Sequence, residues 1–175
     1  MIIGNGDMAS AITTMEVAHR DGVLFFASGV SNSQETRESE YDREVQLLLS
    51  QNRSKHLVYF SSLSVFYMKS RYTEHKLMME GLIRREFPKY TIIRLGNITW
   101  GTNPKTIINF FRNRIENGES VEIRDEYRYI IDIDEFRHWI SLIPTWSCEM
   151  NLTGRRMKII DIMNEYVYLG SKLNV

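Results

Sequence analysis

A tyrosine and a lysine spaced for acid–base chemistry are the most informative pair in this chain. Tyr72 and Lys76 lie four residues apart in a segment of helical pattern, so both side chains project from one face of that helix. An ammonium beside a phenol stabilises the phenolate, and a tyrosine so placed can act as an acid or a base near neutral pH. Ser62 ends the preceding apolar run, where a hydroxyl is placed to bind a substrate hydroxyl or carbonyl.

A glycine-rich loop at the N-terminus is typical of phosphate binding. Gly4, Gly6 and Ala9 form a G-x-G-x-x-A pattern between an apolar strand and a helix. Such a pattern permits a sharp turn, the close approach of a pyrophosphate and tight packing of helix on strand. Asp7 lies inside this loop, and a carboxylate that faced the phosphates would repel them. The next strand ends Ala27-Ser28-Gly29, without the acid that commonly holds the adenosine ribose.

The elements that must position these residues alternate between strand-like and helix-like patterns. This alternation favours βαβ units and a parallel sheet. The continuous apolar run at Val23–Ala27 is typical of a strand buried on both faces. The expected strands are Met1–Ile3, Val23–Ala27, Leu57–Phe60, Thr91–Leu95, Val121–Arg124 and Tyr129–Ile133. The expected helices are Met8–His19, a segment at 41–49, Tyr72–Phe87, one that starts at Asn103-Pro104, one capped by Asp134, and Ile159–Leu169.

Size and composition predict a single soluble domain. The 175 residues include 43% hydrophobic and 25% charged residues, which is ordinary for a globular protein. The 22 basic and 22 acidic residues balance, so net charge gives no argument for nucleic acid or for an anionic membrane. Cys148 is the only cysteine, the histidines are scattered, and neither an apolar run long enough for a membrane helix nor a signal peptide is found. We therefore expect a cytoplasmic protein without a disulfide or a metal site.

Three fragments in this order resemble the short-chain dehydrogenase/reductase superfamily. They are the glycine loop at 4–9, Ser61-Ser62 at the end of an apolar run, and Tyr72-Thr73-Glu74-His75-Lys76. The group they resemble is the NAD-dependent epimerase/dehydratase (extended) group, which works on nucleotide sugars. The segments 94–101, 128–135 and 151–154 resemble later parts of the same family in the same order. The resemblance thus covers nearly the whole chain.

The resemblance implies a Rossmann-like, doubly wound, mainly parallel α/β sheet. It places residues 1–175 in one domain, with a small substrate-side region formed by about 97–133 and 146–175. Phe25–Ser31 is similar to the family's fourth strand, so the second and third strands have no counterpart here. Part of the first mononucleotide-binding half is therefore expected to be missing.

The resemblance also implies a set of site residues. Ser62, Tyr72 and Lys76 would be catalytic, with Tyr72 as acid or base and Lys76 on the nicotinamide ribose. The residues implied to bind NAD or NADP are Gly4, Asn5, Gly6, Met8, Ala9, Ala27, Ser28, Gly29, Ser61 and Lys76. Those implied to contact a nucleotide-sugar substrate are Ser64, Asn97 and Arg128. Family members often form homodimers through the tyrosine-bearing helix, so a homodimer is expected.

Two functions of different classes follow. One is an NAD(P)-dependent epimerase, dehydratase or reductase that acts on a nucleotide-linked sugar through Ser62, Tyr72 and Lys76. The alternative is a non-catalytic relative that binds a nucleotide or a partner on a reduced Rossmann scaffold. Asp7, the missing ribose acid and the shortened first half motivate the alternative, whereas the retained Ser–Tyr–Lys set argues against it.

Overall fold

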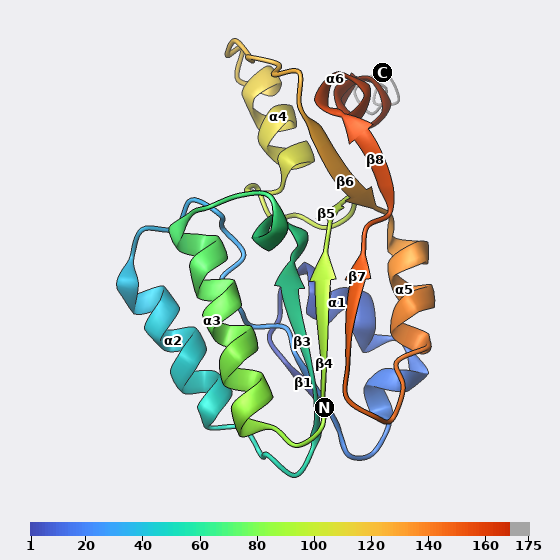
Figure 1. Cartoon of the computed structure of the whole chain (residues 1–175). Helices are drawn as coiled ribbons and strands as arrows, with labels where there is room; N and C mark the ends of the chain where they lie inside the picture. The colour runs from blue at the N-terminus through green and yellow to red at the C-terminus, as the bar shows by residue number, and fades with distance from the viewer. Residues whose placement is uncertain (169–175) are drawn as a thin grey trace.

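A five-stranded parallel sheet forms the centre of the main body in the computed structural model, which describes residues 1–168 (Figure 1). The strands lie side by side in the order β1-β2-β3-β4-β7, and every neighbouring pair is parallel. Their bounds are β1 (Ile2–Ile3), β2 (Val23–Phe26), β3 (His56–Ser62), β4 (Tyr90–Leu95) and β7 (Cys148–Leu152). The predicted strands at the N-terminus, 23–27, 57–60 and 91–95 are thus confirmed.

Helices cover both faces of this sheet. One face carries α2 (Glu38–Leu49) and α3 (Arg71–Glu86). The other carries α1 (Asp7–Thr13), the 3₁₀ turn η1 (Glu16–His19) and α5 (Ile133–Ser141). Alternate residues of β2 serve the two faces, since Val23 and Phe25 pack beneath α1 and α5 whereas Leu24 and Phe26 pack beneath α2 and α3. The fold is the predicted Rossmann-like α/β class.

The connection through α1 has an unusual hand. Each step from β1 to β2, β3 and β4 moves the same way across the sheet. Two crossover connections that move in the same direction across a sheet have opposite handedness if their helices lie on opposite faces. Here α1 lies on one face of the sheet, and α2 and α3 lie on the other (Figure 1). About 98% of such crossovers are right-handed, as those through α2 and α3 are. The β1-α1-β2 unit is therefore a rare left-handed crossover.

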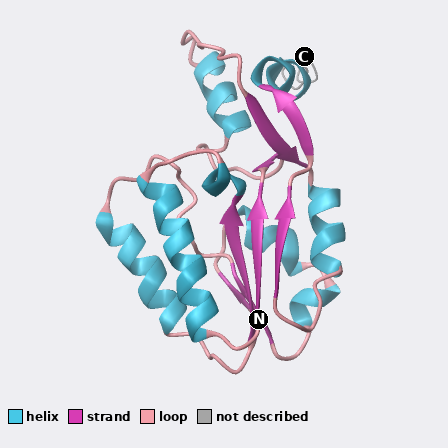
Figure 2. Ribbon diagram, viewed as in Figure 1, coloured by secondary structure: helices cyan, strands magenta, loops and turns pink. Residues whose placement is uncertain are grey.

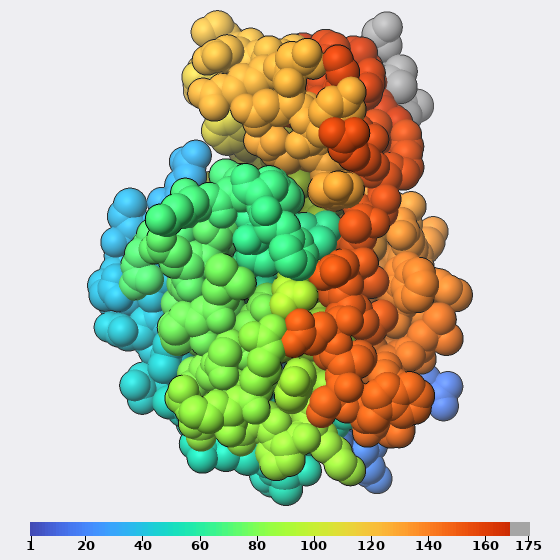
Figure 3. Space-filling model, viewed as in Figure 1, coloured from blue at the N-terminus to red at the C-terminus, as the bar shows by residue number. Residues whose placement is uncertain are grey.

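A smaller lobe stands at the carboxyl end of the strands (Figures 1 and 2). It contains β5 (Asn97–Ile98), α4 (Ile107–Glu116), β6 (Tyr127–Ile131), β8 (Arg155–Lys158), α6 (Ile159–Ile162) and the π-helical turn η3 (Met163–Tyr168). Its strands form a second sheet in the order β5-β6-β8, and α4 and η3 close its own apolar core. Figure 3 shows the lobe as a knob narrower than the main body.

The structure corrects several predicted boundaries. β7 belongs to the main sheet, so the second part of the substrate-side lobe begins at β8 and not at residue 146. The predicted helix Met8–His19 breaks because Met15 is extended, which leaves α1 and η1. The predicted strand Val121–Arg124 was wrong, since β5 and β8 already occupy both edges of β6.

Two predicted helix starts lie some residues too early or too late. Asp132, and not Asp134, caps α5 by accepting the Glu135 N–H at 2.8 Å. The helix expected to start at Asn103-Pro104 begins at Ile107, with Thr106 as its N-cap. The predicted C-terminal limit of the last helix, at Leu169, lies outside the described residues. Within residues 1–168, no helix combines the length and the apolar character needed to cross a membrane.

Candidate functional site

The predicted site residues gather at the carboxyl edge of the main sheet, where it meets the lobe. The glycine loop follows β1, Ala27-Ser28-Gly29 follows β2, and Ser61-Ser62 ends β3. Because the strands are parallel and adjacent, these segments lie side by side at one edge. Ligands of open α/β sheets bind outside this edge. The fold therefore places the candidate residues where a ligand site is expected.

Tyr72 and Ser62 sit on elements that follow β3 directly. Ser62 ends the strand and caps the 3₁₀ turn η2 (Leu63–Phe66), because its Oγ accepts the Ser64 N–H at 3.2 Å. The Ser62 and Ser64 hydroxyl oxygens are also hydrogen-bonded at 2.8 Å. Tyr72 lies half-buried in the first turn of α3, which Ser70 and Thr73 close with a reciprocal capping box. Both hydroxyl-bearing side chains are thus held on rigid turns.

Lys76 is buried within a polar cluster instead of lying open at this edge. The residue is 2% exposed. Its Nζ donates to Glu44 Oε1 at 3.1 Å and to the Tyr59 hydroxyl at 3.0 Å. The Tyr72 ring centroid lies 5.7 Å from the same Nζ. The tyrosine and the lysine are therefore on one face of α3 as predicted, but a carboxylate already neutralises the ammonium.

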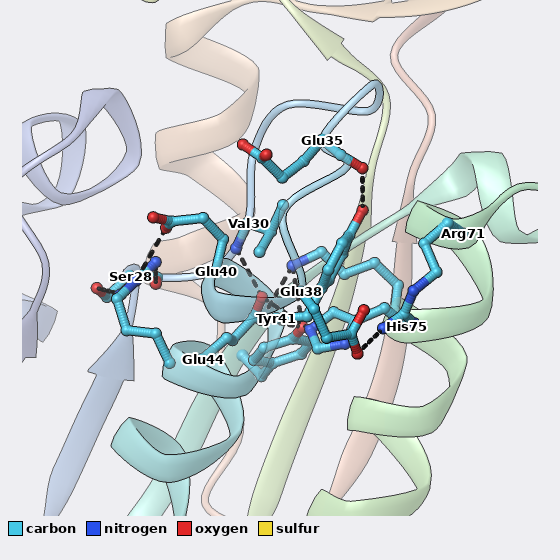
Figure 4. A network of polar contacts seen from close by, with 12 residues as sticks. Ser28, Val30, Glu35, Glu38, Glu40, Tyr41, Glu44, Arg71 and His75 are labelled. Carbon is cyan, nitrogen blue, oxygen red and sulfur yellow. Dashed lines mark hydrogen bonds and ion pairs between the residues drawn. The ribbon is translucent and has the colours of Figure 1, made fainter.

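Glu44 of α2 is the centre of this cluster, and sequence reasoning missed it (Figure 4). It is 0% exposed and accepts four hydrogen bonds, from Lys76, the Tyr59 hydroxyl, His75 Nε2 and the Val30 N–H. Burial alone would raise the pKa of Glu44, but Lys76 and the three other donors outweigh it and hold the pKa well below its usual range. Glu44 is therefore ionised in the folded protein.

Tyr59 links the two charges of the cluster. Its hydroxyl donates to Glu44 Oε1 at 2.6 Å while it accepts from Lys76. Burial, and then the Glu44 charge, raise the pKa of Tyr59 well above its ordinary value. Tyr59 thus stays a neutral phenol and cannot serve as a base.

Ser61 is committed to a second buried network on the same face. Its Oγ donates to Glu80 Oε1 at 2.7 Å, and Arg94 Nε donates to the same oxygen at 2.9 Å. Arg94 also reaches Glu149 of β7 at 2.8 Å. These contacts tie α3 to β4 and β7. The Ser61 hydroxyl is thereby turned into the fold, toward α3, and not toward the open edge.

The glycine loop is joined to the loop that follows β5. The Asp7 carboxylate accepts the backbone N–H groups of Thr102 and Asn103 at 3.0 and 3.1 Å. Gly101 packs so tightly that a Cβ there would lie 2.1 Å from the Asp7 carboxyl carbon. Asn103 Nδ2 then donates to Ser31 Oγ at 3.2 Å. Asp7 therefore faces a neighbouring loop, and these contacts fasten three loops of the edge together.

The other residues predicted to bind cofactor lie around this loop with different exposures. Ala9 is buried in the sheet–helix core, and Met8 packs against it. Asn5 is exposed, and the Ser28 hydroxyl accepts from Arg43 at 3.3 Å. A Cβ on Gly4 would lie 2.4 Å from the Ala27 carbonyl oxygen, whereas a Cβ on Gly6 would meet nothing within 4 Å. Gly4 is thus closely packed against the end of β2, whereas Gly6 faces open space.

Aromatic side chains connect the site to the lobe. The Tyr67 and Tyr129 rings pack with centroids 6.4 Å apart. Burial raises the pKa of Tyr67 above its ordinary value, and the Arg128 charge acts against this rise. Tyr67 follows η2 and precedes α3, so the segment that bears Ser62 and Tyr72 contacts the lobe through this ring. Arg128 pairs with Glu126 at 2.7 Å, and Asn97 Nδ2 donates to the Tyr129 carbonyl at 3.2 Å.

Several solved structures of similar fold come from one group of enzymes. The UDP-glucuronic acid 4-epimerase from Bacillus cereus is 13% identical with a TM-score of 0.65, and 89% of this chain and 64% of that chain are covered. The dTDP-glucose 4,6-dehydratase from Bacillus anthracis, solved with NAD, is 15% identical with a TM-score of 0.63 and coverages of 95% and 61%. The fold is that of nucleotide-sugar epimerases and dehydratases.

The chain is shorter than these enzymes. The enzyme WbmG from Bordetella bronchiseptica, solved with NAD and UDP, is 16% identical with a TM-score of 0.62. That match covers 82% of this chain but only 54% of WbmG. The chain thus spans about half to two thirds of these neighbours, as a shortened form of the fold would. No family model and no curated protein matches the sequence.

The residues present do not fit a dinucleotide held in the way the resemblance implies. The backbone at Gly29 passes directly over the Glu44–Lys76 pair, and a Cβ there would lie 2.7 Å from Glu44 Oε1 and 2.8 Å from Lys76 Nζ. Because Lys76 is also 2% exposed and bound to Glu44 and Tyr59, its ammonium presents no open surface to a ribose. In the part of the chain that the structure describes, no strand lies beyond β1 to shape an adenosine pocket. Within residues 1–168, no group of three or more metal-ligating side chains is found either.

Proposed function

We propose that this chain binds a nucleotide-linked sugar at the carboxyl edge of its main sheet, in the angle between the sheet and the lobe. The observation that carries the proposal is the position of Ser62 and Tyr72 at the starts of η2 and α3, on either side of Tyr67, which packs on Tyr129 of the lobe. The fold is shared with enzymes whose structures hold UDP or UDP-sugars. A hydroxyl-rich edge with Arg128 on the neighbouring lobe suits a ligand that joins a sugar to phosphates.

Each predicted side chain has a role in this proposal. The Ser62 and Tyr72 hydroxyls donate to, or accept from, sugar hydroxyls, and Ser64 supports Ser62 through their 2.8 Å hydrogen bond. Arg128 supplies positive charge for a phosphate, and Asn97 holds β5 against β6 through the Tyr129 carbonyl. Of Ser62 and Tyr72, only Tyr72 is a phenol, and it could therefore also exchange a proton with the sugar.

Calorimetric titration with UDP-glucose and dTDP-glucose tests this proposal. We expect saturable binding that Arg128→Ala weakens about tenfold or more, because a hydrogen bond to a charged group contributes about 1.5–3 kcal/mol. Arg53→Ala is the matched control, since Arg53 pairs with Glu86 at the opposite end of the sheet. Absence of binding at millimolar ligand, or equal weakening by both variants, would contradict the proposal.

A second candidate is turnover with NAD or NADP, as an epimerase, dehydratase or reductase. What favours it is the presence of Ser62, Tyr72 and Lys76 in the family's order, with Ser62 at the end of β3 and the other two on α3. If the chain is such an enzyme, Tyr72→Phe abolishes turnover while the circular dichroism spectrum and melting temperature stay as in the wild type. Turnover that survives Tyr72→Phe would remove Tyr72 from this role.

Homodimerisation through α3 completes the proposal. Leu77 and Met78 are about half exposed on the outer face of this helix, at 48% and 45%. Exposed apolar pairs on a helix surface are suited to helix–helix contacts. Light scattering is expected to give twice the monomer mass for the wild type and the monomer mass for Leu77→Glu; a monomeric wild type would contradict a dimer.

A further inference from the structure

The hydrogen-bonding capacity of Glu44 is fully used inside the fold. An ionised carboxylate accepts about four hydrogen bonds. Oε1 takes the Tyr59 hydroxyl at 2.6 Å and Lys76 at 3.1 Å, and Oε2 takes the Val30 N–H at 2.6 Å and His75 at 3.1 Å. The donors come from β3, from α3 and from the loop after β2. No acceptor site is left for a ligand.

Lys76 is equally enclosed. Two of its three ammonium protons go to Glu44 and Tyr59. The Gly29 backbone covers the pair without room for a methyl group, and the Tyr72 ring lies on another side at 5.7 Å from Nζ. A ligand hydroxyl could reach the third proton only if the loop after β2 moved away and broke the Val30 bond to Glu44.

We propose that Glu44 is the permanent partner of Lys76, in the place of a cofactor, and that the site accepts a single nucleotide-linked ligand but no nicotinamide dinucleotide. This inference deepens the proposed function and rests on it only for the identity of the accepted ligand.

The Asp7 contacts support the same conclusion independently. Asp7 holds the loop at Gly101–Asn103 directly on the glycine loop, with no room for a methyl group at Gly101. The Asn103 side chain then joins this loop to the loop after β2 by donating to Ser31. A dinucleotide laid from Gly6 toward Lys76 would have to separate these loops. Asp7 and Glu44 thus occupy the two positions, at the glycine loop and at Lys76, where such a ligand would be bound.

Titrations of the whole chain with NADH, NADPH and UDP-glucose test the proposal, with nicotinamide fluorescence and calorimetry as readouts. We expect no saturable binding of NADH or NADPH up to millimolar concentration, and saturable binding of UDP-glucose.

A direct readout of the pair completes the test. The ¹⁵N-labelled ammonium of Lys76 is expected to give a slowly exchanging NMR signal that NADH does not shift, with Lys89→Met as a control at the opposite end of the sheet. Micromolar binding of NADH, or a shift of the Lys76 signal by it, would overturn the proposal. If neither NADH nor UDP-glucose binds, the exclusion of a dinucleotide stands, whereas the accepted ligand and with it the proposed function fail.

Discussion

Glu44 determines the chemistry available at Lys76. A buried carboxylate and a buried ammonium each lose hydration, and only their mutual contact and further hydrogen bonds offset this loss. Here Tyr59, His75 and Val30 supply the further bonds. The result is a charged pair that joins α2, α3, β3 and the loop after β2. The pair therefore belongs to the stability of the fold as well as to the site.

Replacing Glu44 alone should be strongly destabilising. Glu44→Gln leaves the Lys76 ammonium buried without its counter-charge, and breaking a buried pair in this way costs about 3–5 kcal/mol. Urea unfolding measures this loss as a lower midpoint. Asp42→Asn, on the exposed face of the same helix, should change the free energy of unfolding by less than about 0.5 kcal/mol. A loss for Glu44→Gln as small as for Asp42→Asn would refute the pairing.

Acid should weaken the fold through the same carboxylate. The pKa of Glu44 is lower in the folded protein than the ordinary value of about 4.3 that applies in the unfolded chain. Its contribution is thus complete above about pH 5 and is lost as the pH falls below the unfolded value toward the folded one. Unfolding free energies measured from pH 7 to pH 3 should decline more steeply in the wild type than in Glu44→Gln. Parallel curves would contradict this linkage.

At the scale of elements, the β1-α1 junction is fixed by Gly4. Its φ is +122°, and a Cβ there would lie 2.4 Å from the backbone oxygen of Ala27 at the end of β2. Gly6, two residues later, has no atom within 4 Å of such a Cβ and caps α1 with φ −81°. Gly4 is thus required by the backbone conformation and by close packing, whereas Gly6 leaves open space beside the loop.

Alanine substitutions should separate these two glycines. Gly4→Ala is expected to lower the melting temperature markedly, since both the positive φ and a backbone clash oppose it. Gly6→Ala is expected to leave the melting temperature within a few degrees of the wild type and to serve as the matched control. Equal shifts in differential scanning calorimetry would show that the loop does not pack on β2 as described.

Asp7 should act on the loop after β5. Asp7→Ala removes the acceptor of the Thr102 and Asn103 N–H groups, which then become open to solvent. Hydrogen exchange followed by NMR should therefore speed up at these two amides while the core of β3 stays protected. Asp21→Ala, at an exposed turn, should change neither amide. Unchanged exchange at Thr102 and Asn103 would contradict the loop closure.

The sequence predicted helices and strands better than it predicted contacts between side chains. The apolar runs at 23–27 and 91–95 and the helix at 72–87 follow from local pattern and are confirmed. Glu44 was not found because acids in polar helices are usually solvated, although it lies three residues after buried Tyr41 and four before buried Leu48. The buried face of this helix, with Glu44 in line with Tyr41 and Leu48, was the pattern that could have revealed a buried Glu44. The strand expected at 121–124 failed because only tertiary context decides which edges of β6 are free.

At the scale of the molecule, the shortening and the left-handed crossover have one explanation. The resemblance implied that two strands between β1 and β2 have no counterpart, and the structure shows β1 paired directly with β2 at the edge of the sheet. With α1 kept on the face of α5, the direct step can only be left-handed. The part of the fold that is present includes the carboxyl edge of the main sheet next to the lobe, and Ser62 and Tyr72 lie at this edge.

We propose that a nucleotide-linked sugar binds between the sheet edge and the lobe. The most direct test is an NMR titration of the ¹⁵N-labelled chain with UDP-glucose. The account predicts shifts that concentrate at residues 62–72 and 127–129, with few at the opposite face around Trp139 and Trp146. No shifts at millimolar ligand, or shifts centred on that opposite face, would contradict it.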